Sequence, residues 1–355
     1  MSTAATLKGL PDLVAAGFVV AAQAPALEKV VARYAVAVTP AMAALIDRND
    51  THDPIARQFL PDPAELVQRP GELADPIGDE VHSPVPGVVH RYPDRALLKL
   101  VHACPVYCRF CFRREMVGPG GKALNGAALD VAIAYLASRP AIWEVVMTGG
   151  DPFTLSARRV REVTKRLEAI PHLKVIRWHS RVPVVAPERI TVDYARALRA
   201  RGKATWVGIH ANHPRELTVE ARAALGRLAD AGNVLVSQSV LLRGVNDDVE
   251  TLEALMRAFV ENRVKPYYLH HPDMAPGTGH FRLGLAEAQA LVKALRGRVS
   301  GLCQPVHVLD LPGGHGKVPV AASLVTPPAN ADGQWQIEDR HGVSHAYDEG
   351  IVRTG

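Results

Sequence analysis

A regular alternation of short apolar runs and longer helical patterns, beginning near residue 95, constrains the fold most strongly. The apolar, β-branched runs are RALLKLVHAC, WEVVMTGGD, LKVIRWHS, ATWVGIH, NVLVSQSVLLRG and VKPYYLHH. Helix-like segments such as TVEARAALGRLADAG and DVETLEALMRAFVENR lie between them. Six βα units in succession predict a parallel sheet covered by helices. Right-handed crossovers can close such a sheet fully or partly into a barrel.

Polar and glycine-rich clusters follow the predicted strands directly. A cysteine-rich stretch comes after the first strand, TGGD after the second, HSR after the third, HANHP after the fourth and HHPD after the sixth. In a parallel α/β barrel, the carboxyl ends of the strands form the rim at which ligands bind. The sequence therefore predicts one functional site at this rim.

The chain divides by pattern into three regions. Residues 1–90 have helical spacing followed by a stretch dense in proline and glycine, which predicts a helical extension packed on the core. Residues 91–300 are expected to form the barrel, and residues 301–355 a C-terminal segment with a polar tail that forms an edge hairpin or a solvated end. The run LVAAGFVVAA has the length of a signal-peptide core, but Asp12 directly precedes it, so an amphipathic helix is favoured.

Composition narrows the class of protein. The chain has 355 residues, 48% of them hydrophobic, which is typical of a soluble enzyme of one or two domains. The net charge is +5, but aromatics are only 5% and the basic residues are spread along the chain. This disfavours nucleic acid and membrane partners and favours anionic small molecules. Four unevenly spaced cysteines do not form a secreted disulfide framework, so a reducing cytoplasm is expected.

Three of the four cysteines lie together in CPVYCRFCFRR. A structural zinc site usually has four ligands in two paired knuckles, and the Cys-x3-Cys-x2-Cys spacing supplies no second knuckle. Cys303 or a histidine could in principle complete one. A [4Fe-4S] cluster held by three thiolates instead leaves one iron open for a substrate or cofactor. The triplet alone leaves both interpretations open.

A second candidate is Lys317, which follows three glycines in VLDLPGGHGKVPV. A flexible surface loop with a solvated lysine would explain such a stretch. A phosphate-binding loop is excluded because the spacing is short and no Ser or Thr follows the lysine. The alternative is a lysine close to a backbone-lined pocket, where its amine can bind pyridoxal phosphate covalently.

The cysteine spacing on the loop after the first strand resembles that of the radical S-adenosylmethionine (SAM) superfamily. More specifically, HRYPDR, CPVYCRFCFRR, HANHP, SQSVLLRGVND, KPYYLHHPD, GHFR and DLPGGHGK, in this order, resemble the lysine 2,3-aminomutase family. The likeness extends from about Arg91 to Val320. It implies a partial (βα)6 TIM-like barrel with a helical N-terminal extension and a short C-terminal segment. It also implies an isomerase that uses a [4Fe-4S] cluster, SAM and pyridoxal 5'-phosphate.

The resemblance also implies roles for individual residues. The cluster ligands would be Cys104, Cys108 and Cys111, and the residue that holds pyridoxal phosphate would be Lys317. Arg91 and Arg95 would lie near that cofactor. SAM contacts would come from Gly149, Gly150, Asp151, His213 and Gln238. The substrate carboxylate would be received by Arg113, and the distant ammonium of lysine by Asp273 and Asp310.

The implied reaction is the conversion of L-lysine to β-lysine, with a reductant such as flavodoxin or ferredoxin. The sequence has no C-terminal cysteine cluster of the kind that binds zinc between subunits in free-lysine enzymes, so the form of any homo-oligomer stays open. The shorter length is similar to relatives that make (R)-β-lysine for elongation factor P, which is the alternative function. A non-catalytic iron-sulfur protein would not need the cysteines, Lys317 and both aspartates together.

Overall fold

The barrel sheet is continuous from the first strand to the ninth. The computed structural model describes residues 5–327, 334–339 and 341–347. The strands pair in the order of the sequence. Seven of them are parallel neighbours: β2 (Arg95–Val101), β3 (Glu144–Gly149), β4 (Val175–Ser180), β5 (Ala204–His210), β6 (Val234–Val240), β7 (Val264–His270) and β8 (Val306–Leu311). The antiparallel edge strands are β1 (Val88–Tyr92) and β9 (Gly316–Pro319).

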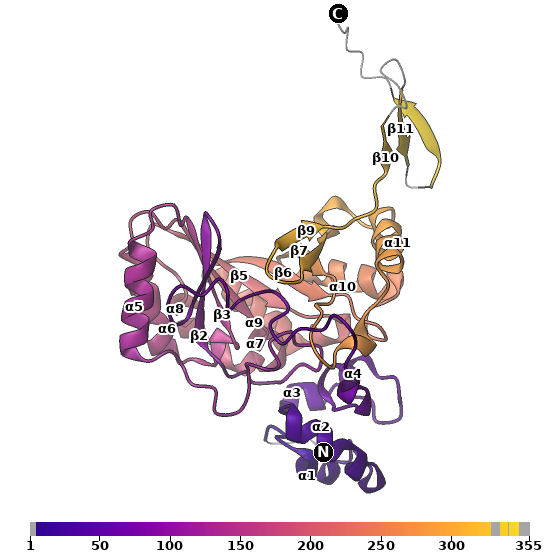
Figure 1. Cartoon of the computed structure of the whole chain (residues 1–355), viewed down its shortest axis with the longest axis horizontal. Helices are drawn as coiled ribbons and strands as arrows, with labels where there is room; N and C mark the ends of the chain where they lie inside the picture. The colour runs from indigo at the N-terminus through magenta and orange to yellow at the C-terminus, as the bar shows by residue number, and fades with distance from the viewer. Residues whose placement is uncertain (1–4, 328–333, 340, 348–355) are drawn as a thin grey trace, which may run out of the picture.

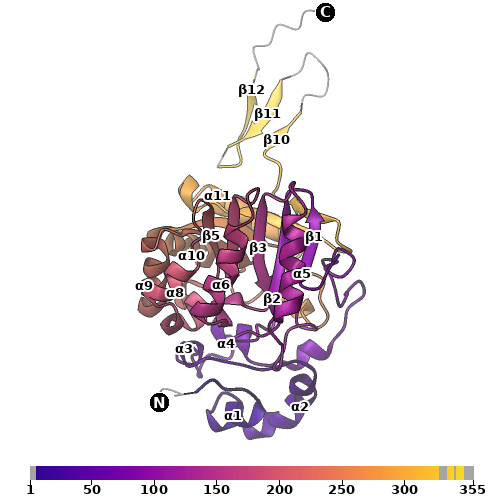
Figure 2. The ribbon, with the colours of Figure 1, turned by 90° about the vertical axis from the view of Figure 1, so that its left-hand side faces the viewer.

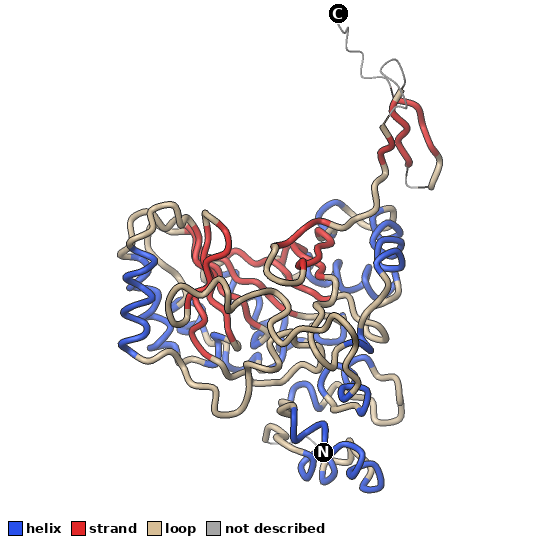
Figure 3. Tube along the Cα trace, in the orientation of Figure 1, coloured by secondary structure: helices blue, strands red, loops and turns tan. Residues whose placement is uncertain are grey.

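The two edges of this curved sheet approach each other. The backbone N–H of Lys317 on β9 donates to the hydroxyl of Tyr92 on β1 at 2.8 Å. The sheet therefore forms a nearly closed barrel, with its strands grouped inside and the helices outside (Figures 1 and 3). This confirms the predicted fold class.

Helices cover the outside of the barrel, and most of them begin at a residue whose side chain caps the helix. They are α5 (Gly126–Ala137), α6 (Ala157–Glu168), α7 (Val182–Val185), α8 (Val192–Ala197), α9 (Val219–Asp230), α10 (Val249–Glu261) and α11 (Leu285–Arg296). At α6, for example, the hydroxyl of Ser156 accepts the N–H of Arg159, and at α10 the carboxylate of Asp248 accepts the N–H of Thr251. Such caps satisfy amide groups that have no partner within the helix.

The six predicted strands correspond to β2 through β7, and the structure adds β1 before them and β8 and β9 after them. The sequence around β8 and β9 suggested a glycine-rich loop. In the structure, that stretch is a tight hairpin in which Gly313 and Gly314 have φ of 85° and 86°. Positive φ favours glycine, so the glycines mark a turn between two strands.

The N-terminal extension consists of α1 (Leu10–Ala15), α2 (Ala24–Arg33), α3 (Pro40–Ala43) and α4 (Pro54–Phe59). The single helix predicted over LVAAGFVVAA is wrong, because α1 ends at Ala15 and Gly17 has φ of 72°. Buried side chains of the extension belong to the same hydrophobic cluster as those of the barrel. No helix in the described part of the chain is both long and apolar enough to cross a membrane.

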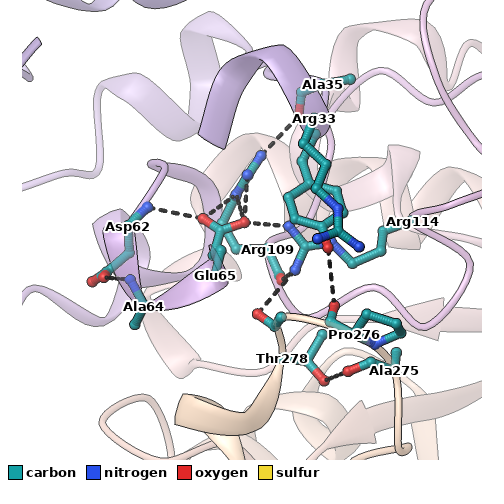
Figure 4. Close-up of polar contacts among 12 residues, drawn as sticks. Arg33, Ala35, Asp62, Ala64, Glu65, Arg109, Arg114, Ala275, Pro276 and Thr278 are labelled. Atoms are coloured by element: carbon teal, nitrogen blue, oxygen red, sulfur yellow. Dashed lines mark hydrogen bonds and ion pairs between the residues drawn. The ribbon is translucent and has the colours of Figure 1, made fainter. Parts of the chain in front are cut away.

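One buried carboxylate joins the extension to the cysteine-bearing loop (Figure 4). Glu65 accepts two hydrogen bonds from Arg109 Nε, at 2.9 and 3.1 Å, and one from Arg109 Nη2 at 2.5 Å. It also forms an ion pair with Arg114. Both arginines lie within three residues of Cys111, so Glu65 fixes the backbone on either side of this cysteine.

Replacing Glu65 by alanine is expected to lower the free energy of unfolding by about 3–5 kcal/mol, because two buried guanidinium groups lose their counter-ion. Urea unfolding followed by circular dichroism measures this loss. The matched control is Asp230→Ala, which removes an exposed ion pair with Arg263 at 2.8 Å and should cost at most about 1 kcal/mol. Equal losses in the two variants would contradict the structural role of Glu65.

The described part of the polar tail forms a separate antiparallel sheet. Its strands are β10 (Val325–Thr326), β11 (Trp335–Glu338) and β12 (Ser344–Tyr347). The sheet projects from the barrel on the side opposite the N-terminal helices (Figures 1 and 2). The described part of the tail is thus neither an edge hairpin of the barrel nor an irregular solvated end.

Candidate active site

A cavity of about 420 Å³ occupies the interior of the barrel. The predicted site residues that line it are Arg91, Arg95, Cys104, Cys108, Cys111, Arg113, Gly149, Gly150, Asp151, Gln238, Asp273, Asp310 and Lys317. His213 does not line the cavity; its Nδ1 accepts the N–H of Arg215 at 3.2 Å, and the preceding Asn212 lines the wall instead. The structure therefore brings all but one of the predicted residues together.

The glycine turn after β3 holds the cysteine loop in place. The N–H of Gly150 donates to the carbonyl of Val101 at 2.5 Å, and the N–H of Asp151 donates to that of Ala103 at 3.0 Å. A Cβ atom on Gly150 would overlap the Ala103 backbone. Glycine is therefore required at this position for the two loops to approach so closely.

The Asp151 carboxylate also ties neighbouring loops together. It accepts hydrogen bonds from Ser180 Oγ at 2.8 Å and from the N–H groups of Phe153 and Arg181 at 2.9 and 2.7 Å. Burial raises the pKa of Asp151, and these donors oppose that rise. The bonds within the protein occupy this carboxylate, so its observed role is to join β3 to β4.

The three cysteines lie half-buried on the loop between β2 and α5. Burial raises the pKa of each thiol, and the neighbouring Cys108 adds to the effect at Cys111, whose pKa rises to about 11. Thiolates in this setting need a bound cation. Among the described residues, no group of three or more His, Cys, Asp or Glu side chains is placed to hold a metal ion. In a cubane cluster each thiolate would instead bind a different iron.

Lys317 faces Asp310 across the β8–β9 hairpin. The two residues are direct partners in the antiparallel register, and the Lys317 ammonium donates to Asp310 Oδ2. Burial favours a higher pKa for Asp310, but the hydrogen bond from His270 and the charge of Lys317 outweigh it and hold the pKa well below its usual range. Asp310 is therefore a permanent anion at this wall of the cavity.

A chain of polar side chains extends from Asp310 to other strand ends. His270 Nδ1 lies 3.7 Å from Asp310 Oδ2, and its Nε2 lies 3.2 Å from Gln238 Oε1. Gln238 Nε2 lies 3.3 Å from His179 Nε2. Burial lowers the pKa of His179 and His270, so both imidazoles are neutral at pH 7. A neutral imidazole carries one N–H, so His270 donates either to Asp310 or to Gln238 Oε1, while Gln238 Nε2 can donate to the unprotonated Nε2 of His179.

The pKa of Asp273 is shifted in the opposite direction to that of Asp310. Desolvation, followed by the charge of Asp310, raises the pKa of Asp273 to about 7. The cavity therefore contains one carboxylate that is always ionised and a second that titrates near neutral pH. A cationic group placed near them would favour ionisation of both.

The predicted carboxylate-binding residue, Arg113, is held by an acid that the sequence did not indicate. Arg113 Nε and Nη2 each lie 3.0 Å from the fully buried Asp79, and Arg113 Nη1 donates to Thr148 Oγ1 at 3.2 Å. Lys99 and Arg91 lie 3.8 and 3.6 Å from the same carboxylate. Three cations share one anion, so this wall of the cavity carries net positive charge.

A further cationic group lies on the wall near β1. The Arg95 guanidinium stacks on the Tyr92 ring, 3.7 Å from its centroid. Arg177 pairs with Glu144 at 2.9 Å, and both line the cavity. Together with Lys317, these side chains suit an aromatic cofactor that carries a phosphate and binds through an amine.

The fold and the cysteine loop define a radical SAM enzyme. In agreement, the model of the family described as "Radical SAM superfamily" matches residues 98–256. An L-lysine 2,3-aminomutase from Clostridium subterminale is 39% identical over 318 residues, which cover 90% of this chain and 76% of the relative. One from Acetoanaerobium sticklandii is 40% identical over 313 residues, covering 88% and 75%.

The chain therefore belongs to the L-lysine 2,3-aminomutase family and is an isomerase of the aminomutase type, acting on a small molecule. The resemblance noted in the sequence is confirmed. A glutamate 2,3-aminomutase from Clostridioides difficile is also similar, at 34% identity over 284 residues, which cover 80% of this chain and 67% of that protein. Similarity alone therefore does not distinguish lysine from glutamate as the substrate, and the side chains of the cavity have to identify it.

Proposed function

We propose that this enzyme converts L-lysine to β-lysine with a [4Fe-4S] cluster, SAM and pyridoxal phosphate. The observation that carries the proposal is the paired acids Asp273 and Asp310, which share one cavity with Lys317 and the three loop cysteines. The distant ammonium of lysine needs such acids when it leaves water. The carboxylate side chain of glutamate would meet two acids there, so glutamate is disfavoured.

The residues of the cavity fit these cofactors. Cys104, Cys108 and Cys111 would bind the cluster, which together with SAM supplies an organic radical. Lys317 would hold pyridoxal phosphate, with Arg91 and Arg95 near its phosphate; this cofactor supplies delocalisation of unpaired spin during amino migration. The role of the protein is to position the reacting groups and to exclude water.

The pairing of Lys317 with Asp310 suggests how substrate binding is prepared. Without substrate, the Lys317 ammonium neutralises Asp310. With its nitrogen bound to the cofactor, Lys317 would no longer neutralise Asp310, and Asp310 would be available to the ammonium at the other end of lysine. Arg113, which pairs with Asp79, would receive the substrate carboxylate at this wall.

Replacing Asp310 by asparagine is expected to lower kcat/KM for lysine by about 30-fold or more, since losing one member of a buried charge pair costs at least about 2 kcal/mol. Absorbance of the cluster and of pyridoxal phosphate should be retained. Steady-state kinetics with L-lysine measures the change. Asp193→Asn, which affects an exposed pair with Arg161 at 2.6 Å, is the control. An unchanged kcat/KM would remove Asp310 from the substrate site.

Lysine binding is expected to weaken as the pH falls below about 7. Asp273 must ionise to pair with the substrate ammonium, and its pKa in the free site is about 7. Between pH 7 and pH 6 the Kd for L-lysine should therefore increase about fivefold, because the ionised fraction of Asp273 falls from about one half to about one tenth. Calorimetric titration across pH 6–8 measures this dependence. Asp273→Asn should remove the dependence, and its persistence in that variant would assign it to another group.

An anaerobic assay tests the function. The protein is reconstituted with iron, sulfide and pyridoxal phosphate, and is then given SAM, L-lysine and dithionite in place of a flavodoxin or ferredoxin. Mass spectrometry detects β-lysine, and chiral chromatography separates its enantiomers. The (R) form would favour a role in modifying elongation factor P. Cleavage of SAM without conversion of lysine would support the proposed radical chemistry and contradict the assignment of lysine as the substrate.

A further inference from the structure

A buried arginine that the mechanism above does not use lies against a cysteine of the loop. Arg181 directly follows β4, in the HSR cluster, and its Nη1 donates to Cys108 Sγ at 2.9 Å. Its guanidinium stacks on Phe59 and Phe110, with centroid distances of 4.7 and 5.4 Å. The side chain is 8% exposed, so its charge is not screened by bulk water.

Two buried partners hold this guanidinium in position. Its Nη2 donates to Gln58 Oε1 on α4 and to Glu216 Oε2, both at 2.6 Å. Glu216 Oε1 in turn accepts from Gln58 Nε2 at 3.1 Å and from the N–H of Asn212 at 2.9 Å. Arg181 is therefore a pre-oriented donor that cannot move far from Cys108.

We propose that Arg181 is a positioning residue that sets the reduction potential of the iron-sulfur cluster through the Cys108 sulfur. This inference rests on the proposed function, in which Cys108 binds the cluster. Hydrogen bonds to ligand sulfurs and nearby charges tune such potentials. A fixed positive donor stabilises the cluster most after it has gained an electron, so Arg181 raises the potential. Glu216, a buried anion on the same guanidinium, limits that effect.

The structure thus predicts shifts of opposite sign in the reduction potential when Arg181 and Glu216, which contact each other, are replaced. Arg181→Gln removes the positive charge and leaves Glu216 uncompensated, so the potential should fall. Glu216→Gln removes the negative charge, so the potential should rise. Arg181→Lys keeps a charge but not the fork of donors and should lie between wild type and Arg181→Gln. A loss of general stability would not produce shifts of opposite sign.

The experiment is an anaerobic redox titration of the reconstituted full-length protein and its variants, in which electron paramagnetic resonance measures the one-electron-reduced cluster. At a fixed potential, Arg181→Gln should lower the ratio of reduced to oxidised cluster about tenfold, equivalent to about 59 mV for a one-electron couple. Arg189→Gln is the control, because Arg189 lies on the same segment but, among the described residues, donates to the carbonyls of Phe153 and Thr154 and not to a cysteine.

The outcomes separate this inference from the function on which it rests. Wild-type protein that binds no cluster would reject the proposed function. A wild-type cluster whose potential is the same in every cluster-containing variant of Arg181 and Glu216 would reject only the role of Arg181. If Arg181→Gln holds no cluster, the decision rests on Glu216→Gln and Arg181→Lys: an upward shift in the first and a downward shift in the second support the inference.

Discussion

Replacing Cys111 by alanine is expected to give a folded protein that holds no [4Fe-4S] cluster and does not cleave SAM. Two thiolates remain on the loop, and a site-differentiated cubane needs three. Iron and sulfide analysis and the visible absorbance after reconstitution measure the loss. The effect on turnover should be complete, because no other group in the cavity can supply the electron that starts the reaction.

Cys303→Ala provides the matched control for this substitution. Cys303 is buried in the short 3-10 helix before β8 and does not line the cavity. This variant should bind the same amount of iron as wild type and keep its activity. Loss of the cluster in Cys303→Ala, or its retention in Cys111→Ala, would overturn the assignment of the ligands.

Replacing Lys317 by alanine is expected to abolish covalent binding of pyridoxal phosphate and to lower turnover by about 10²-fold or more, because a cofactor without its covalent attachment is not held in the reactive position. Borohydride reduction followed by peptide mass spectrometry should find the cofactor on Lys317 in wild type and nowhere in the variant. The cluster should still assemble, because Lys317 makes no contact with the cysteine loop in its observed hydrogen bonds.

The control for this prediction is Lys293→Ala. Lys293 lies on α11 and pairs with Glu338 at 2.5 Å on the surface. Covalent cofactor at Lys317 and normal turnover are expected in this variant. If borohydride fixed the cofactor to another lysine in wild type, Lys317 would lose its proposed role.

The barrel was predictable because its signals are local. Each of β2 to β7 is a short apolar run, all but β6 were recognised by the polar or glycine-rich cluster that follows, and neighbouring βα units pair in sequence order. The three cysteines were also recognisable because they lie within eight residues. By contrast, β8 and β9 were missed since their pairing depends on the conformation of the PGGHG turn, which composition alone does not show.

The residues that hold the site side chains in position were the hardest to predict from the sequence. Asp79 lies in a stretch dense in proline and glycine with no periodic pattern, yet it pairs with Arg113, 34 residues later in the chain, at 3.0 Å. Gln58 and Glu216 meet Arg181 only through tertiary packing. A usable signal did exist for Arg181, because it ends the HSR cluster at the predicted rim. His213 illustrates the limit of placement by motif: the adjacent Asn212 is the residue that lines the cavity.

In the β8–β9 hairpin, the number of residues in the turn decides whether Lys317 faces Asp310. Asp310 and Lys317 are opposite each other in the register, and a slip of one residue would turn Lys317 to the other face of the sheet. Gly313, Gly314 and Gly316 all have positive φ, which keeps the turn tight. In genetic terms, inserting or deleting one codon between Asp310 and Lys317 would take the lysine side chain away from Asp310, just as replacing the lysine codon would.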